Sequence, residues 1–164
     1  MIPSSRICPY RRMQKESIVI CGGGLRYLPS TCITLSMLRT LGWSGETQVV
    51  GLQSEEDSRI RRILRQAGAH FVVIDAAQLA LLKRPWEFAN MRCEWLVKPI
   101  AVLNAPTSNV LFMDADNLPI RNPKGLFENQ QFRAFGALFW PDLKRMDKDR
   151  SIWRIMGYSI SGRS

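Results

Sequence analysis

Short apolar runs alternate with helix-like segments along the chain from residue 17 to residue 113. Four of the runs have the length and composition of buried strands: residues 17–21, 47–52, 70–74 and 109–113. Their almost continuous apolar character is typical of strands that helices cover on both faces, as in a parallel sheet. The alternation therefore predicts an α/β domain with a mostly parallel sheet and helices on both of its faces. Residues 132–140 form a fifth apolar run.

Two of the intervening segments carry helix start signals. A helix is predicted over residues 30–41, because Pro29 and Ser30 precede it as start signals and Gly42 follows it as a stop signal. Its apolar positions are Ile33, Leu35, Met37, Leu38 and Leu41. A shorter helix, opened by a proline, is predicted over residues 99–105.

A further helix is predicted from Ser54, its expected N-cap, to Gly68. The acids at residues 55–57 would then lie in its first turn, where they suit the helix dipole. Its expected buried face carries Ile60, Ile63, Leu64 and Ala67, and its other side carries Arg59, Arg61, Arg62 and Arg65. No aromatic side chains are interleaved with these arginines, as base-stacking surfaces require. We therefore interpret them as a solvated helix face rather than a nucleic-acid surface.

Charge and cysteine content narrow the class of ligand. The 164 residues carry a net charge of +9, which favours anionic partners such as nucleic acid, anionic lipid or phosphorylated small molecules. The four cysteines form no CxxC pair and the single histidine has no ligand-like neighbours, so no zinc site is expected. We expect reduced thiols, with Cys21 buried in the first strand. The expected organisation is a basic flexible leader (1–16), one domain (17–143) and an incomplete C-terminal segment (144–164).

Two carboxylates, Asp114 and Asp116, directly follow the fourth apolar run and are separated by Ala115. In open α/β sheets, ligands bind at the carboxyl ends of the strands. Two neighbouring acids repel each other, and a divalent cation would relieve that repulsion. Mg²⁺ and Mn²⁺ favour sites with one or two carboxylates that water and substrate phosphates complete. The pair therefore predicts a Mn²⁺ or Mg²⁺ site beside a diphosphate; two solvated loop acids are the alternative.

Two further features stand near predicted strand ends. Lys98, beside the short helix, could reach a phosphate as a mobile point charge. The glycines at 22–24, followed by Arg26 and Tyr27, would let backbone N–H groups approach phosphate or ribose. The dinucleotide fingerprint fails, because Tyr27 replaces its third glycine and the second strand leads to Gln53 instead of an acid. Lys98 and Arg26 could each equally be ordinary surface side chains.

Other interpretations of the acid pair are weaker. An EF-hand loop needs glycine and glutamate where this chain has Pro119 and Gly125, so it is excluded. A phosphatase of the haloacid-dehalogenase type, with Asp114 as nucleophile, survives as an alternative. It usually carries Thr or Val at the position of Leu118, and its motif lies near the start of the chain. A non-catalytic anion-binding module that uses the arginine-rich helix is a third hypothesis.

Four stretches, taken in order, carry a family resemblance: Ile18-Val-Ile-Cys-Gly-Gly-Gly-Leu-Arg-Tyr-Leu-Pro29, Trp95-Leu-Val-Lys-Pro99, Val110-Leu-Phe-Met-Asp-Ala-Asp-Asn117 and Phe135-Gly-Ala-Leu-Phe-Trp-Pro-Asp142. They resemble the mannosyltransferase family that contains the fungal cell-wall α-mannosyltransferases. The stretches around Lys98 and Asp114 are more distantly similar to glycogenin-like glycosyltransferases. The resemblance covers about residues 17–160.

The resemblance implies a GT-A-like, Rossmann-type fold and metal-dependent transfer of a hexosyl group, in this family mannosyl. The donor would be a nucleotide sugar, GDP-mannose or a UDP-hexose, and the acceptor a glycan or glycoprotein in the Golgi. No nucleic-acid partner is expected. Because the family continues beyond Ser164 into acceptor-binding segments, we expect this chain to be the donor-binding half.

The same resemblance assigns roles to individual residues. Asp114 and Asp116 would bind Mn²⁺ and the donor diphosphate, and Lys98 would approach the phosphates. The donor pocket would be lined by Gly22, Gly23, Gly24, Arg26, Tyr27 and Ala115. Asn117 and Trp140 would be further pocket residues. The sequence identifies no general base and no catalytic residue.

Overall fold

The computed structural model describes residues 16–80 and 97–139. The chain divides into two compact units, Met1–Glu128 and Asn129–Ser164. The predicted leader, apart from Glu16, and the predicted C-terminal segment lie outside the described residues. None of the helices within these two described ranges is long and apolar enough to span a bilayer.

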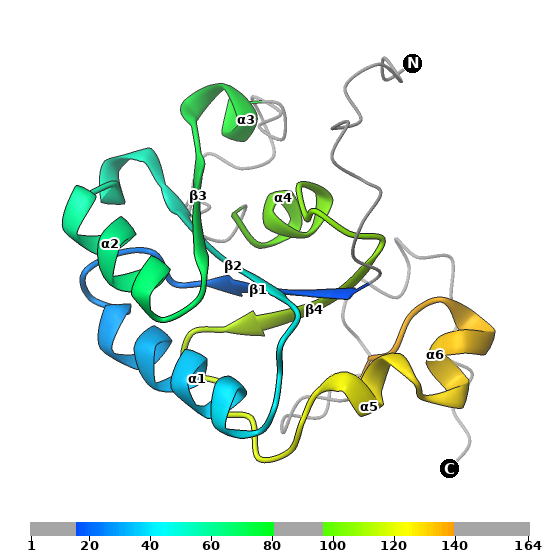
Figure 1. The fold of residues 1–164 in the computed structure, drawn as a ribbon. Coiled ribbons are helices and arrows are strands. Elements are labelled where there is room, and N and C mark those ends of the chain that lie inside the picture. Colours follow the sequence, from blue (N-terminus) through cyan, green and yellow to red (C-terminus); the bar gives the residue numbers. More distant parts are fainter. Residues whose placement is uncertain (1–15, 81–96, 140–164) are drawn as a thin grey trace, which may run out of the picture. The chain divides into compact units, whose positions relative to one another are not determined.

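The first unit contains a four-stranded, fully parallel sheet (Figure 1). Its strands are β1 (Glu16–Cys21), β2 (Glu46–Leu52), β3 (His70–Ile74) and β4 (Asn109–Asp114). They lie in the order β3-β2-β1-β4, so that the first strand pairs with both the second and the fourth. The four apolar runs are thus confirmed as strands, and the fold is α/β and Rossmann-like.

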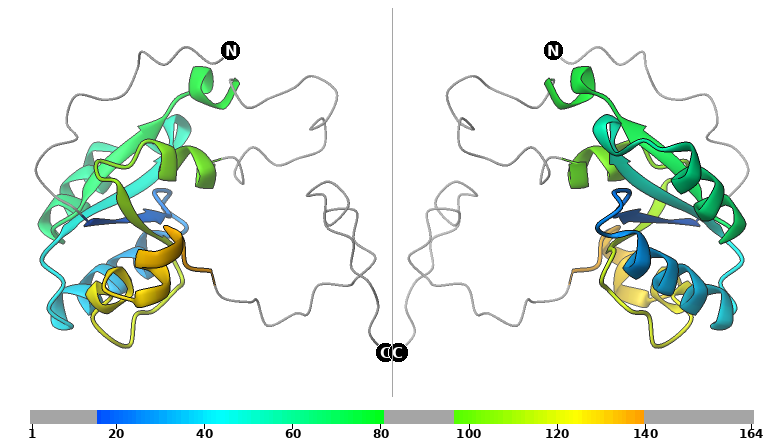
Figure 2. Two further views of the ribbon diagram at one scale, coloured as in Figure 1. Left: turned by 90° about the vertical axis from the view of Figure 1, so that its right-hand side faces the viewer. Right: turned by 90° about the vertical axis from the view of Figure 1, so that its left-hand side faces the viewer.

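Helices cover both faces of this sheet. Helices α1 (Leu28–Thr40) and α2 (Ser58–Gln66) lie on one side, and α3 (Ala76–Ala80) and α4 (Val97–Leu103) lie on the other (Figures 1 and 2). The described part of the unit also contains two short elements: the 3-10 turn η1 (Gln53–Glu55) and helix α5 (Lys124–Phe127). In the second unit, the described residues include helix α6 (Gln130–Phe135), which ends at Gly136 with φ +72°.

Alternation along β1 assigns its side chains to the two faces. Val19 belongs to the cluster that α4 covers with Val97, Ile100 and Ala101. Ile18 and Ile20 therefore face α1 and α2, where they are completely buried. The same side of the core contains Leu35, Leu38, Ile60 and Leu64, each at most 1% exposed.

Helix α1 begins at Leu28 and not at the predicted Ser30, and its N-cap is Tyr27. Its buried face also differs from the prediction, because Ile33 is 55% exposed whereas Thr31 and Thr34 are fully buried. Both threonine hydroxyls donate hydrogen bonds to backbone carbonyls, so their burial leaves no polar group unsatisfied. An apolar pattern alone could not indicate this face.

The helix predicted from Ser54 to Gly68 begins later than expected. Residues 53–55 form η1, and α2 starts at Ser58 with Asp57 as its N-cap. The Asp57 Oδ1 accepts a hydrogen bond from the backbone N of Arg59 at 2.6 Å. The helix is amphipathic as predicted at Ile60 and Leu64, but Ile63 is 37% exposed. Because the helix starts later, Glu55 belongs to η1 and not to the helix.

The prediction for the third helix is also displaced. Helix α4 (Val97–Leu103) already includes the two residues before Pro99. A proline is compatible with the first turn because the N–H that it lacks has no partner there. Lys98 is consequently part of the helix instead of preceding it.

Candidate functional site

A cavity of about 400 Å³ opens at the carboxyl ends of the strands. Its walls come from the ends of β1, β2 and β4 and from the first turn of α4. From β1 the chain passes to β2, which is the neighbour of β1 on one side within the sheet. Strand β4 is the neighbour of β1 on the other side. A change of direction of this kind is the switch point at which open α/β sheets bind ligands.

Most of the residues that the sequence predicts for the site line this one cavity. They are Gly22, Gly23, Arg26, Tyr27, Lys98, Asp114, Ala115 and Asp116. Gly24 does not line it but lies immediately behind, against the carboxylate of Glu55. Trp140 lies outside the described residues, and the exposed Asn117 takes part through its backbone.

The acid pair is held in a tight turn at the end of β4. Asp114 is the last residue of the strand and is the register partner of Cys21 on β1. Its carbonyl accepts a hydrogen bond from the backbone N of Asn117 at 3.0 Å, which closes the turn. Ala115 is 2% exposed, so the turn is anchored by its central residue. Both acids therefore border the cavity from a backbone that is packed against the core.

Two threonines of α1 fix the loops that carry the site. The Thr31 hydroxyl donates to the Gly22 carbonyl at 2.9 Å. The Thr34 hydroxyl lies within hydrogen-bonding distance of two carbonyls, those of Ala115 at 3.1 Å and Asn117 at 3.3 Å. A single buried helix face thus holds the glycine turn after β1 and the acid turn after β4.

Gly22 lets those two turns approach each other. A Cβ atom at this position would lie 2.4 Å from the Ala115 Cβ and 2.9 Å from the Thr31 Oγ1. At Gly23, the added atom would lie 2.3 Å from the Phe71 ring. The first two glycines are therefore required by packing, because neighbouring chain segments approach them too closely for a side chain.

Lys98 forms an ion pair with one of the acids. Its Nζ lies 2.7 Å from the Asp114 Oδ1 and 5.8 Å from the centroid of the Phe112 ring. The two side chains are 45% and 40% exposed. A pair so accessible to water contributes on the order of 0–1 kcal/mol, so a ligand can displace it at little cost. Asp114 retains its second carboxylate oxygen for another partner.

Arg26 and Tyr27 border the cavity from the turn after β1. Both are exposed, and the Arg26 guanidinium lies 5.5 Å from the centroid of the Tyr27 ring. Their exposure leaves the cation and the ring accessible to a ligand. The structure thus places them at the rim of the cavity and not in its floor.

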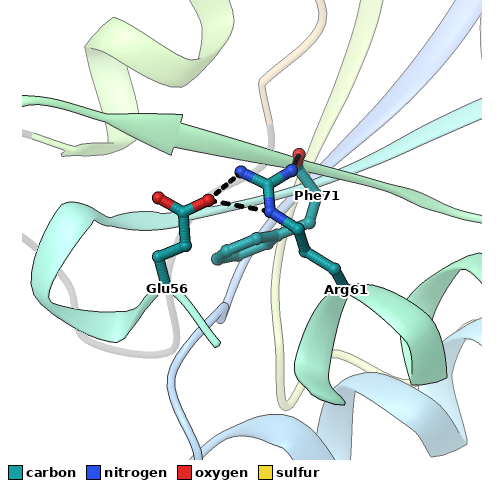
Figure 3. Close-up of polar contacts among 3 residues, drawn as sticks. All are labelled: Glu56, Arg61 and Phe71. Atoms are coloured by element: carbon teal, nitrogen blue, oxygen red, sulfur yellow. Dashed lines mark hydrogen bonds and ion pairs between the residues drawn. The ribbon is translucent and has the colours of Figure 1, made fainter. Parts of the chain in front are cut away.

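The arginine-rich helix is mostly a solvated face, as predicted, since Arg59, Arg62 and Arg65 are exposed. Arg61 differs, as Figure 3 shows. Its Nε donates to Glu56 Oε1 at 2.8 Å and its Nη1 donates to the Phe71 carbonyl at 3.2 Å. The guanidinium also lies 5.4 Å from the centroid of the Phe71 ring, which packs behind Gly23. Arg61 therefore supports the wall of the cavity.

Sequence reasoning missed two polar residues of the lining, Cys21 and Glu55. The prediction for Cys21 is a reduced thiol buried in the first strand, whereas the residue is half-buried at the cavity. The prediction for Glu55 is an acid in the first turn of a helix. Burial, followed by the nearby Asp114 carboxylate, raises the pKa of Cys21 to about 12, so its thiol is protonated at neutral pH. The sequence signal for Glu55 was its place just beyond β2, at the same sheet edge as the acid pair.

The donor groups suit a hard divalent cation. Nowhere in the described ranges do three or more His, Cys, Asp or Glu side chains gather in a group that could hold a metal. Asp114 and Asp116 supply two carboxylates beside open cavity space. Mg²⁺ and Mn²⁺ accept such a set because waters and substrate phosphates provide the remaining oxygen ligands.

These features define an α/β Rossmann-like domain with a cavity at its switch point that Asp114, Asp116 and Glu55 help to line. The sequence matches the family described as "Mannosyltransferase putative" over residues 15–163. The chain belongs to this mannosyltransferase family.

The chain is similar to three fungal proteins in particular. Alpha-1,2-mannosyltransferase MNN21 of Candida albicans is 30% identical over 155 residues, which cover 90% of this chain and 23% of that protein. Alpha-1,2-mannosyltransferase MNN24 of the same organism is 28% identical over 151 residues, covering 90% and 20%. Alpha-1,2-mannosyltransferase MNN2 of Saccharomyces cerevisiae is 29% identical over 63 residues, covering 38% and 11%. The chain thus spans less than a quarter of the length of these relatives.

Proposed function

We propose that this domain binds the nucleotide-sugar donor of a metal-dependent mannosyl transfer. The observation that carries the proposal is the single cavity at the switch point. It brings together two carboxylates from β4, a lysine from α4 and a glycine turn from β1. Family membership adds mannosyl transfer as the reaction class. It also favours transfer over the phosphatase alternative, because the similar proteins named above are all mannosyltransferases.

The proposed roles follow from the positions of the side chains. Asp114 and Asp116 would hold Mn²⁺ or Mg²⁺ in the cavity. A cation bound there supplies positive charge that neutralises a departing nucleoside diphosphate. Lys98 would exchange its exposed partner Asp114 for a phosphate oxygen, to which it brings a further positive charge. The backbone turn at Gly22 and Gly23 would lie along the nucleotide.

The donor and the acceptor are proposed at different levels of detail. GDP-mannose is the proposed donor, on the strength of the family resemblance and the names of the relatives. A glycan is the proposed acceptor, as these names imply. Within the described ranges we identify no acceptor site.

Calorimetry with GDP tests the proposal directly. We expect binding in the presence of Mn²⁺ that EDTA abolishes, since carboxylates cannot hold a diphosphate without the cation. Asp116→Asn should remove this binding. The matched control is Asp75→Asn, which changes an exposed acid just after β3 that does not line the cavity.

Two results would contradict the proposal. One is GDP binding that is unchanged by EDTA, and the other is equal loss in the Asp116 and Asp75 variants. Beryllium fluoride provides the arm for the phosphatase alternative. An aspartyl adduct at Asp114 would support that alternative, and its absence is expected here.

A further inference from the structure

Glu55 is an acid in the cavity wall for which the proposed function gives no role. It lies in η1, directly after β2, and lines the cavity from the side opposite the acid pair. Strand β1 separates β2 from β4. The carboxylate is half-buried, so it is part of the wall and not a freely moving surface group.

The backbone is shaped around this carboxylate. The Leu52 N donates a hydrogen bond to Glu55 Oε2 at 2.8 Å. A Cβ atom at Gly24 would lie 2.3 Å from Oε1, and one at Gly51 would lie 2.9 Å from Oε2. The carboxylate therefore occupies space that exists only because Gly24, in the turn after β1, and Gly51, in β2, lack side chains.

The backbone N of Leu52 uses only one of the two carboxylate oxygens. Oε2 is the atom that accepts from Leu52, whereas Oε1 accepts no hydrogen bond from any residue in the described parts of the chain. A backbone N–H holds this carboxylate in the cavity wall, and one of its oxygens accepts no such bond. A carboxylate of this kind is suited to accept hydrogen bonds from the donor groups of a ligand.

The spacing of the acids fits the length of one nucleotide. Neighbouring strands lie about 4.8 Å apart, so the ends of β2 and β4 are separated by roughly 10 Å. A diphosphate held at Asp114 and Asp116 leaves the β2 side for the rest of the ligand. A carboxylate repels phosphate but attracts hydroxyl and N–H groups, which are the polar groups of a nucleoside.

We propose that Glu55 binds the nucleoside part of the donor through its ribose hydroxyls or base N–H groups. The donor then lies across the sheet edge with its nucleoside over β2 and its diphosphate over β4. Glu55 is thus a specificity-determining residue, and this inference rests on the proposed function. In dinucleotide-binding folds, an acid beyond the second strand contacts ribose in the same manner. Here η1 places Glu55 at that point, although the strand itself leads to Gln53.

The test compares a ligand that has a nucleoside with one that lacks it. Affinities for GDP and for inorganic pyrophosphate, each with Mn²⁺, are measured by calorimetry on the wild-type chain, Glu55→Gln and Glu128→Gln. Glutamine retains an oxygen for Leu52 but turns an amino group toward the ligand. We expect GDP binding by Glu55→Gln to weaken about tenfold or more, which corresponds to one charge-assisted hydrogen bond. Pyrophosphate binding should be the same within about twofold.

Glu128→Gln is the matched control, because it removes the same charge from an exposed residue of the same unit, which does not line the cavity. Two nucleotide analogues separate the possible contacts in the wild-type chain: 2′-deoxy-GDP lacks a ribose hydroxyl and inosine diphosphate lacks the exocyclic amino group. The analogue that lacks the contacted group should show no further loss in Glu55→Gln.

The possible failures are distinguishable. If the wild-type chain binds neither GDP nor pyrophosphate with Mn²⁺, the proposed function fails and this inference fails with it. If it binds both, and Glu55→Gln weakens neither or weakens both equally, the orientation proposed here is wrong while the metal site stands. Should Glu55→Gln fold poorly by circular dichroism, the two analogues still decide: equal affinity of the wild-type chain for GDP and for both analogues overturns the inference.

Discussion

The face of the sheet under α1 and α2 is closed, whereas the face under α4 is open at the carboxyl ends of the strands. On the closed face, Ile18, Ile20, Leu35 and Leu38 are at most 1% exposed. On the other face, helix α4 covers Val19, Val50 and Ile74, but the strand ends beyond them border the cavity. The difference indicates that the closed face holds in place the turns that border the cavity, whereas the cavity opens on the other face.

The comparison predicts that truncation on the closed face has the largest effect on stability. Leu38→Ala should lower the free energy of unfolding by about 2–5 kcal/mol, because the side chain is 1% exposed and leaves a cavity. Urea unfolding followed by circular dichroism measures this. The control on the same helix is Ile33→Ala, where a side chain that is 55% exposed should cost less than about 1 kcal/mol. Equal losses in the two variants would mean that the assigned faces of α1 are wrong.

A smaller effect is expected where the two faces meet, at Gly22. Gly22→Ala places a methyl group 2.4 Å from the Ala115 Cβ, so the glycine turn and the acid turn must move apart. We expect a loss of about 1–3 kcal/mol in unfolding free energy, as for other overpacked sites, together with weaker Mn²⁺-dependent GDP binding.

The control for this variant is Gly125→Ala within α5, where the added atom meets nothing within 4 Å. It should leave GDP binding unchanged and stabilise the chain slightly, by about 0.5–1 kcal/mol, because alanine favours the helix. If Gly22→Ala is as benign as Gly125→Ala, the close approach of the two turns is not required.

The strands of this fold were predictable from the sequence, and the shape of the site was not. Local apolar runs indicate the strands. Because the carboxyl ends of parallel strands lie at one edge of the sheet, Asp114 and the glycine turn are expected at the same edge. Thr31 and Thr34 were missed because their burial depends on carbonyls outside their own helix, 9 residues away for Thr31 and 81 residues away for Thr34.

Glu55 shows the same limit of local reasoning. The acids at 55–57 fit a helix start, and only the three-dimensional structure shows η1 turning one of them into the cavity. The position of Lys98 relative to Asp114 was likewise unpredictable, since it depends on how α4 packs across the sheet. Sequence patterns indicate elements, whereas sites arise from contacts between elements.

Thr34 on the closed face allows a test of whether helix α1 holds the acid turn after β4 in place. Thr34→Val keeps the shape of the side chain but removes the hydroxyl that contacts the carbonyls of Ala115 and Asn117. We expect a loss of about 1–2 kcal/mol in stability, since a buried acceptor loses its partner. Mn²⁺-dependent GDP binding should also weaken, and Thr34→Ser should restore it.

The control is Thr47→Val on the same face of the sheet. It removes the acceptor for the Trp43 Nε1, which lies 3.1 Å from the Thr47 hydroxyl, but neither residue borders the cavity. It should cost comparable stability and leave GDP binding intact. A Thr34 variant that behaves like Thr47→Val would mean that the acid turn holds its shape without α1.

The smallest expected effect concerns Cys21, whose thiol lies on the open face beside Asp114. Burial, and then the neighbouring carboxylate, raises its pKa from 9.0 to about 12. Any stability from the protonated thiol is therefore present below pH 9 and is lost as the pH rises toward 12.

Because the thiolate is the nucleophile, Cys21 should react slowly with iodoacetamide at pH 8, in spite of the cavity beside it. Site-resolved mass spectrometry should show faster alkylation at Cys32, where burial alone raises the pKa of the thiol and no carboxylate in the described ranges adds to it. In guanidinium, both thiols should be alkylated much faster. Equal rates at Cys21 in the folded and unfolded chain would show that its environment on the open face is not the one described here.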